Sequence, residues 1–171
     1  MKTWLQPLTR TCLALAVLML LLAPGAGAAG EAPDLERLLQ ETGLKYRTLS
    51  PEAFAIPFEA RDGRSIEVYL TWWDSDRDFA LLFTTVLDLE DQHAFTPDLM
   101  REALQLNNGH PTAKFVIDAD RGDLDCQTEL DATTLTAESL KKHLDLLAAV
   151  ADDTRARLEA LEGAGTAVPG P

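Results

Sequence analysis

Acidic side chains recur at alternate positions in two segments of the chain, and carboxylates with this spacing can bind calcium. Asp118, Asp120 and Glu129 occupy positions 1, 3 and 12 of a twelve-residue calcium-binding loop. Position 6 of such a loop requires glycine, and this sequence has Asp123 there. Residues 74–78 repeat the Asp-x-Asp-x-Asp spacing, but no acid follows at the twelfth position. We therefore interpret both segments as solvated turns between strands, and keep an exported metal-dependent binder or hydrolase as the alternative.

Histidine and nucleophilic side chains show no arrangement typical of an active site. His93, His110 and His143 are the only histidines, and none has an i, i+4 partner or a nearby C-x-x-C pair. The sequence also has no G-x-S-x-G elbow, no S-x-x-K, no Gly-rich phosphate loop and no dinucleotide-binding fingerprint. We therefore predict no catalytic residue, no metal site and no cofactor, which indicates a protein that is not an enzyme.

The first 28 residues have the layout of a secretory signal peptide. Lys2 and Arg10 give a positive start, and an apolar run over 11–23 ends at a Pro-Gly break. Ala26 and Ala28 place small residues at the positions that signal peptidases require. We expect cleavage near Ala28, a periplasmic or secreted mature protein, and no membrane span after cleavage. An uncleaved anchor is the alternative, although the apolar run is shorter than the about 20 residues that a span needs.

Cleavage leaves 143 of the 171 residues, a usual size for one domain. It also removes two basic residues, so that 13 Lys and Arg face 28 Asp and Glu and the net charge is −15. Such a chain repels phosphate backbones, which excludes nucleic acid as a partner.

After cleavage Cys126 is the only cysteine, and we interpret it as a small buried strand residue. An intermolecular bridge or a reactive thiol is the alternative.

Apolar periodicity predicts an α+β fold with an antiparallel sheet, a meander plus a hairpin, and helices packed on one face. The predicted order is helix, three or four strands, helix, two strands, helix, within a domain over 33–162. The predicted segments are a helix from Pro33 to a cap at Gly43, strands over 45–49, 54–58, 65–73 and 79–89, a helix from Thr96 that stops at Asn107-Asn108-Gly109, strands over 112–119 and 124–130, and a helix over 137–162. The last helix becomes polar from Asp152, so its second half is expected to project from the body. We expect residues 29–32 to be flexible and the Gly/Ala/Pro tail 163–171 to be disordered.

An aromatic patch is expected on the sheet face that the helices leave open. Alternation places Tyr69 and Trp73 opposite the helix-facing residues of their strand, and Leu82, Val86 and Val116 are predicted to join them. Exposed aromatic patches are typical of interfaces. Phe54 lies in a predicted edge strand that could accept a partner strand. These features favour an exported, non-catalytic domain that binds a protein or peptide; a dimerising structural module is the alternative.

Several motifs resemble the YbjN domain family, which is described as a group of candidate regulators of bacterial sensory transduction. These are the Leu-Gln-Leu-Asn-Asn segment over 104–108, Lys114, Phe115 and Asp118 at the start of the hairpin, and the Thr-x-Glu-x-Leu start of the last helix at Thr136. The resemblance covers about residues 34–161. It implies a fold similar to that of type III secretion chaperones, a sheet and helix surface presented to a partner chain, frequent dimerisation and no catalytic residue. An export signal departs from the chaperone pattern, because secretion chaperones act in the cytoplasm.

Overall fold

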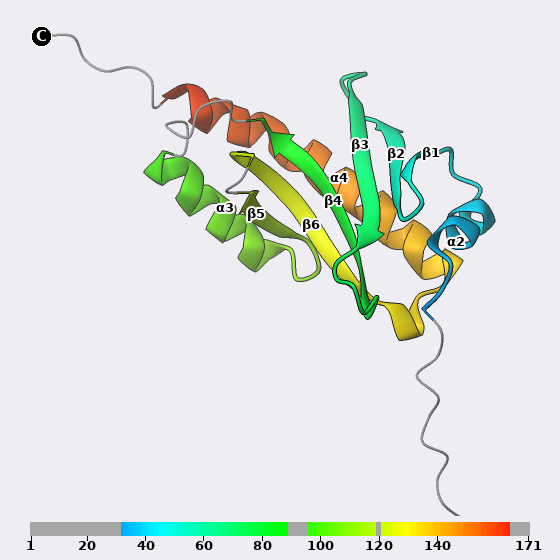
Figure 1. Cartoon of the computed structure of the whole chain (residues 1–171). Helices are drawn as coiled ribbons and strands as arrows, with labels where there is room; N and C mark the ends of the chain where they lie inside the picture. Colours follow the sequence, from blue (N-terminus) through cyan, green and yellow to red (C-terminus); the bar gives the residue numbers. More distant parts are fainter. Residues whose placement is uncertain (1–31, 89–95, 119–120, 165–171) are drawn as a thin grey trace, which may run out of the picture. The chain divides into compact units, whose positions relative to one another are not determined.

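The computed structural model describes the backbone of residues 32–88, 96–118 and 121–164, and side chains as far as Leu161. The predicted signal peptide, residues 29–31 and most of the predicted tail lie outside these ranges, as do Asp120 and His93. The elements, labelled in Figure 1, are in chain order α2 (Leu35–Thr42), β1 (Arg47–Ser50), β2 (Ala53–Glu59), β3 (Ser65–Trp72), β4 (Phe79–Leu87), α3 (Pro97–Gly109), β5 (Lys114–Asp118), β6 (Asp123–Asp131), a 3-10 turn (Ala132–Thr134) and α4 (Ala137–Ala164).

The six strands form one antiparallel sheet in the order β1-β2-β3-β4-β6-β5. The chain enters the hairpin at the sheet edge with β5, and β6 then returns between β5 and β4. This arrangement confirms the predicted α+β class, the antiparallel sheet and the approximate order of elements. The outer strands are β1 and β5, so the strand that contains Phe54 is not an edge strand at that residue.

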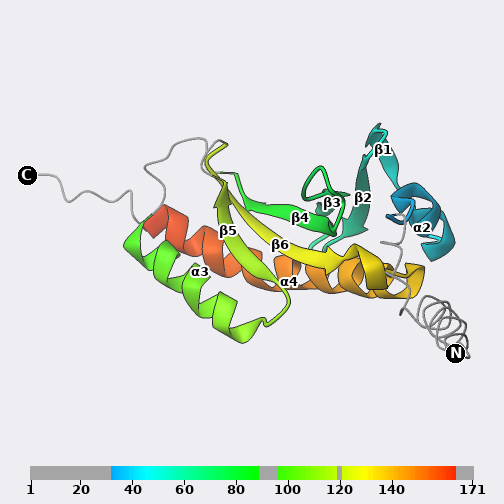
Figure 2. The same ribbon diagram turned by 60° about the horizontal axis from the view of Figure 1, so that its bottom comes forward.

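Helices cover one face of the sheet. Figures 1 and 2 show α4 lying across that face, with α3 beside it under β5. The buried side chains that fill the space between α4 and the sheet include Leu140, Leu144 and Leu147 from the helix and Val68, Leu70 and Leu82 from the strands. Within the described ranges, no helix lies on the opposite face of the sheet, which we call the open face.

The second half of α4 packs on the body, and the expectation that it projects is wrong. Leu158 is fully buried, and the guanidinium of Arg155 donates to the carbonyl oxygens of Thr85 and Val86 at 2.9 and 3.2 Å. Arg157 reaches Glu102 of α3 at 2.8 Å. The arginine residues of this half therefore bind other elements of the fold. A long arginine side chain can lie along an apolar surface while its guanidinium makes hydrogen bonds, so polar sequence here does not mean that the helix projects.

Local signals set the helix ends. Asp34 accepts hydrogen bonds from two first-turn N–H groups of α2, and Gly43 ends that helix with a left-handed φ of 71°. The hydroxyl of Thr96 accepts the N–H of Leu99 at the start of α3, as its position before a proline predicts. As predicted, α3 stops at the Asn107-Asn108-Gly109 segment, which forms its last turn. None of the helices in the described part of the chain has the length and apolarity needed to cross a bilayer.

Candidate functional site

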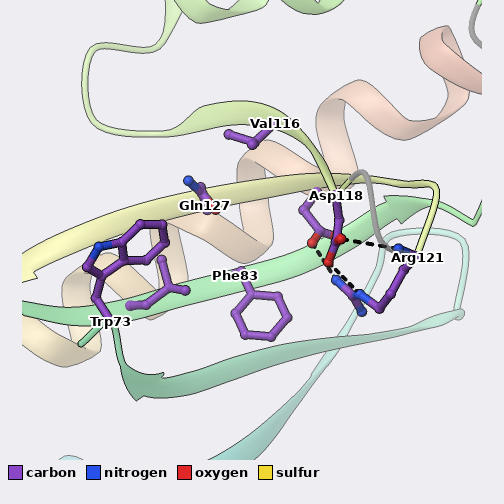
Figure 3. Close-up of a pocket in the computed structure, with 8 residues that line it drawn as sticks. Trp73, Phe83, Val116, Asp118, Arg121 and Gln127 are labelled. Carbon is purple, nitrogen blue, oxygen red and sulfur yellow. Dashed lines mark hydrogen bonds and ion pairs between the residues drawn. The ribbon is translucent and has the colours of Figure 1, made fainter. Parts of the chain in front are cut away.

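A shallow hollow lies on the open face where β3, β4, β6 and β5 run side by side (Figure 3). Its volume is about 250 Å³. Its apolar lining comes from Trp73, Leu81, Phe83 and Val116. Trp73 is 52% exposed, because the chain leaves β3 at this point and turns toward β4. An exposed indole beside a concave apolar surface can bury a partner's side chain, and aromatic residues in such positions are enriched at interfaces.

A chain of contacts fixes the aromatic floor beside this hollow. The rings of Tyr69 and Phe83 stack at 5.0 Å between centroids, with 24° between their planes. The Tyr69 hydroxyl donates to Glu67 at 3.0 Å, and Arg47 of β1 donates to both carboxylate oxygens of Glu67 at 3.0 and 3.3 Å. The Arg47 guanidinium, followed by the Tyr69 hydroxyl, lowers the pKa of Glu67. The floor is therefore held in place before any ligand arrives, which reduces the entropy lost on binding.

Arg121 closes the hollow at the end where β5 and β6 meet. Its guanidinium contacts Asp118 at 2.7 Å, Asp123 at 3.3 Å and Asp125 at 2.6 Å, and its central carbon lies 5.8 Å from the centroid of the Phe83 ring. Figure 3 shows Arg121 directed toward Asp118. The three carboxylates come from neighbouring strands, so one guanidinium links β5, β6 and the floor of the hollow.

Burial and crowding change the proton affinity of these carboxylates. Desolvation raises the pKa of Asp125, whereas the hydroxyl of Thr85 at 2.8 Å and the guanidinium of Arg121 oppose this rise. Desolvation also raises the pKa of Asp123. The Asp118 carboxylate, as the largest cause, raises the pKa of Arg121. One guanidinium therefore does not fully compensate the cost of bringing these carboxylates together.

The predicted patch is correct in part. The structure places Tyr69 and Trp73 on the open face, and Val116 lines the hollow. Leu82 and Val86 are instead buried at 0% and 2% exposure under α4, so the prediction that they lie on the open face is wrong. In an antiparallel pair, residues that lie opposite each other share a face. Leu70 pairs with Leu82 and Tyr69 with Phe83, so the register directs Leu82 inward and Phe83 outward.

The prediction of an edge position for Phe54 is also wrong. Phe54 pairs with Thr48 of β1 on one side and Leu70 of β3 on the other. Its ring is buried and meets the ring of Tyr46 edge-on at 5.7 Å. A partner strand could reach β2 only beyond the four residues of β1, where Pro57 has no N–H to donate.

Sequence reasoning missed Leu81, Phe83, Gln127 and Arg121. Both rows of β4 are apolar, so alternation alone does not show which row faces the helices. The alternating acids of β6 indicate an outward row, but their pairing with Phe83 requires knowing that β6 lies next to β4. That contact joins residues far apart in the sequence.

The other chemical candidates lie away from the hollow or within the Arg121 network. Cys126 is a free, fully buried thiol on the helix side of β6, and burial raises its pKa to about 12. The Nδ1 atom of His143 lies 2.8 Å from the carbonyl oxygen of Ser139, one turn earlier in α4. Asp118 binds Arg121, and Asp120 lies outside the described residues. Across the described residues, no group of three or more His, Cys, Asp or Glu is arranged to hold a metal ion.

Solved structures match this fold. One match is the crystal structure of the ExsC–ExsE complex, with a TM-score of 0.53 and 20% identity over 72% of this chain and 92% of the matched chain. Another is the crystal structure of YbjN from E. coli, with a TM-score of 0.54 and 14% identity over 74% of this chain and 89% of the other. At these identities the likeness concerns the fold. No curated protein sequence matches the chain.

The fold, with one face covered by helices and one open face, is that of a secretion chaperone-like α+β domain. The chain belongs to the family described as TY-Chap1, T3SS (YopN, CesT) and YbjN peptide-binding chaperone 1, whose model matches residues 60–168. This membership confirms the resemblance that the 104–108 segment and the hairpin indicate.

Proposed function

We propose that this domain binds a protein or peptide segment without catalysis, in the hollow on the open face. The observation that carries the proposal is the position of Trp73, which is 52% exposed and lies beside the apolar side chains that line the hollow, Leu81, Phe83 and Val116. The family description as a peptide-binding chaperone supports the same role. The ExsC–ExsE structure is a complex, which shows that a protein of this fold is found with a partner. A binding role requires no cofactor.

The proposal is tested by selecting binding peptides from a displayed random library and measuring their affinity for three forms of the protein. Trp73→Ala should weaken binding at least about tenfold, as expected for an aromatic residue at the centre of an interface. The control is Leu104→Ala, which removes an apolar side chain that is 64% exposed on α3. Equal affinities for the wild type and Trp73→Ala would contradict the proposed site. Both variants should melt near the wild-type temperature, because both side chains are largely exposed.

We further propose that the protein acts outside the cytoplasm. The support is the order of charged, apolar and small residues over 1–28. The test is to recover the protein from fractionated cells and determine its N-terminal residue by mass spectrometry. Recovery from the periplasm or medium with a new terminus near residue 29 is expected. A cytoplasmic protein that retains residues 1–28 would contradict export and would leave the binding proposal intact.

A further inference from the structure

Four of the five open-face residues of β6 are acidic. The pairs Phe83–Gln127, Leu81–Glu129 and Phe79–Asp131 place alternate residues of β6 on the open face. The residues in this row, which we call the acidic row, are Asp123, Asp125, Gln127, Glu129 and Asp131. The residues between them point under the helices, and Leu124, Cys126 and Leu130 are buried there.

An apolar row runs beside the acidic row. The open-face residues of β4 are Phe79, Leu81 and Phe83, followed by Thr85. Neighbouring strands lie about 4.8 Å apart, so each apolar side chain has an acidic or amide neighbour on β6. Phe79 is 41% exposed and Glu129 is exposed. Asp123 and Asp125 are buried beside Arg121, so the accessible negative charge lies at Glu129 and Asp131, next to the apolar side chains of Leu81 and Phe79.

Three cationic side chains near the open face already have hydrogen-bond or ion-pair partners, and none of these partners is Glu129. Arg121 binds the carboxylates at one end of the acidic row, and Arg47 binds Glu67 on β3. The ammonium group of Lys114 donates hydrogen bonds to the carbonyl oxygens of Asn107 and His110, at 3.1 and 3.4 Å. Over the residues that the structure describes, Glu129 takes part in no ion pair. The chain as a whole carries a net charge of −13, which adds a long-range attraction for cations.

We infer that the hollow and the acidic row bind an extended basic segment in which Lys or Arg alternates with apolar residues. This inference rests on the proposed peptide-binding function and names its ligand. Side chains two residues apart in an extended peptide are about 6.6–6.8 Å apart, which is also the spacing of Glu129 and Asp131 along β6. Lys or Arg side chains at every second position can therefore reach Glu129 and Asp131, while the side chains between them cover Leu81 and Phe83 and reach Trp73. An acidic segment in the same position would face like charges, which oppose binding.

The test uses three synthetic peptides with blocked ends and isothermal titration calorimetry of the purified protein. The first peptide alternates Lys with Leu and Phe, the second has Glu in place of every Lys, and the third has the composition of the first with its Lys residues contiguous. The first should bind at least about tenfold more tightly than either of the others, and its affinity should fall with added salt because Glu129 and Asp131 are exposed. Equal binding of the first and third peptides would overturn the alternating pattern.

A charge reversal at the row and a matched reversal elsewhere show whether the row itself attracts the ligand. Glu129→Lys should weaken the first peptide about tenfold and improve the second. Glu138→Lys makes the same change of net charge at an exposed position in the first turn of α4 and should alter affinity less than twofold. Equal weakening by both variants would overturn the inference, because it would mean that only the total charge matters.

The outcome with Trp73→Ala separates the inference from the function on which it rests. If the Glu peptide binds as tightly as the Lys peptide and both lose affinity in Trp73→Ala, the domain binds peptides and the basic specificity is wrong. If the Lys peptide does not bind, and no peptide selected from the library depends on Trp73, the proposed function fails together with the inference. Trp73-dependent binding of the Lys peptide alone supports both.

Discussion

The side-chain amide of Asn107 pairs with the backbone of Phe115 as a neighbouring strand would. Its Nδ2 donates to the carbonyl oxygen of Phe115 at 3.1 Å, and its Oδ1 accepts the Phe115 N–H at 2.6 Å. Phe115 lies in β5 at the edge of the sheet, where such groups are open to pairing with another chain. The last turn of α3 thus occupies this point of the edge, which favours the open face over β5 as the binding surface.

Asn107→Ala should lower the free energy of unfolding by about 1–3 kcal/mol, because it leaves a half-buried N–H and carbonyl without their partner. Chemical denaturation measures the loss, and hydrogen exchange should show faster exchange of the Phe115 amide. The control is Asn108→Ala, which removes the same amide from the adjacent, exposed position. If the two variants lose the same stability, the contact between Asn107 and Phe115 has no special role.

The features that the sequence predicts well are those decided by neighbours in the chain. Gly43 and Thr96 act on groups within four residues of themselves, so composition and spacing are enough to place these helix ends. The predicted start at Pro33 lies two residues before the observed one, because Asp34 is the N-cap of α2. The turn between β2 and β3 is equally local: Asp62-Gly63 lies between the two strands, and Gly63 adopts a positive φ of 82°, which glycine tolerates without steric cost. The class of fold follows from these elements and their order.

The features that the sequence does not predict depend on register and on distant contacts. Leu82 and Phe83 both lie in an apolar strand, and only the pairing of β3 with β4 decides which of them faces α4. The charge of Arg155 suggested an exposed helix end, whereas its partners are the carbonyls of Thr85 and Val86, 70 and 69 residues away in the sequence. The hollow combines residues of β4, β5 and β6 with Trp73, which directly follows β3, so no single segment contains its signal.

Arg155 donates hydrogen bonds to two backbone carbonyls at an irregularity in β4. The pairing of β4 with β6 shifts between Thr85 and Leu87, which indicates a bulge that leaves backbone groups without ladder partners. Arg155→Met should destabilise the fold by about 1.5–3 kcal/mol, because two carbonyls lose a charged donor. Arg101→Met is the control, since Arg101 pairs with Asp98 on the exposed side of α3 and should change stability by less than about 0.5 kcal/mol. Urea titration of both variants gives the comparison, and equal losses would contradict the role of Arg155.

Asp125 should make stability depend on pH. Burial raises its pKa in the native state above the ordinary value of 3.8, which applies to the unfolded chain. At a pH between 3.8 and the raised pKa, the native state therefore binds more protons than the unfolded state. Stability contributed by this group therefore falls as pH rises through that window. Asp125→Asn is uncharged at every pH, so its stability relative to the wild type should increase as the pH rises above 3.8. Denaturant titrations at several pH values measure this, and a difference that does not change with pH would contradict it.

Cys126 should be inert in the folded protein. Its thiol is fully buried, and with a pKa of about 12 only about one molecule in ten thousand carries the reactive thiolate at pH 8. A thiol reagent such as dithionitrobenzoate should therefore modify the wild type no faster than it unfolds, and should react at once in denaturant. A reaction that is fast under native conditions, or a disulfide-linked dimer on non-reducing gels that Cys126→Ser abolishes, would show instead that the thiol is accessible and available for an intermolecular bridge.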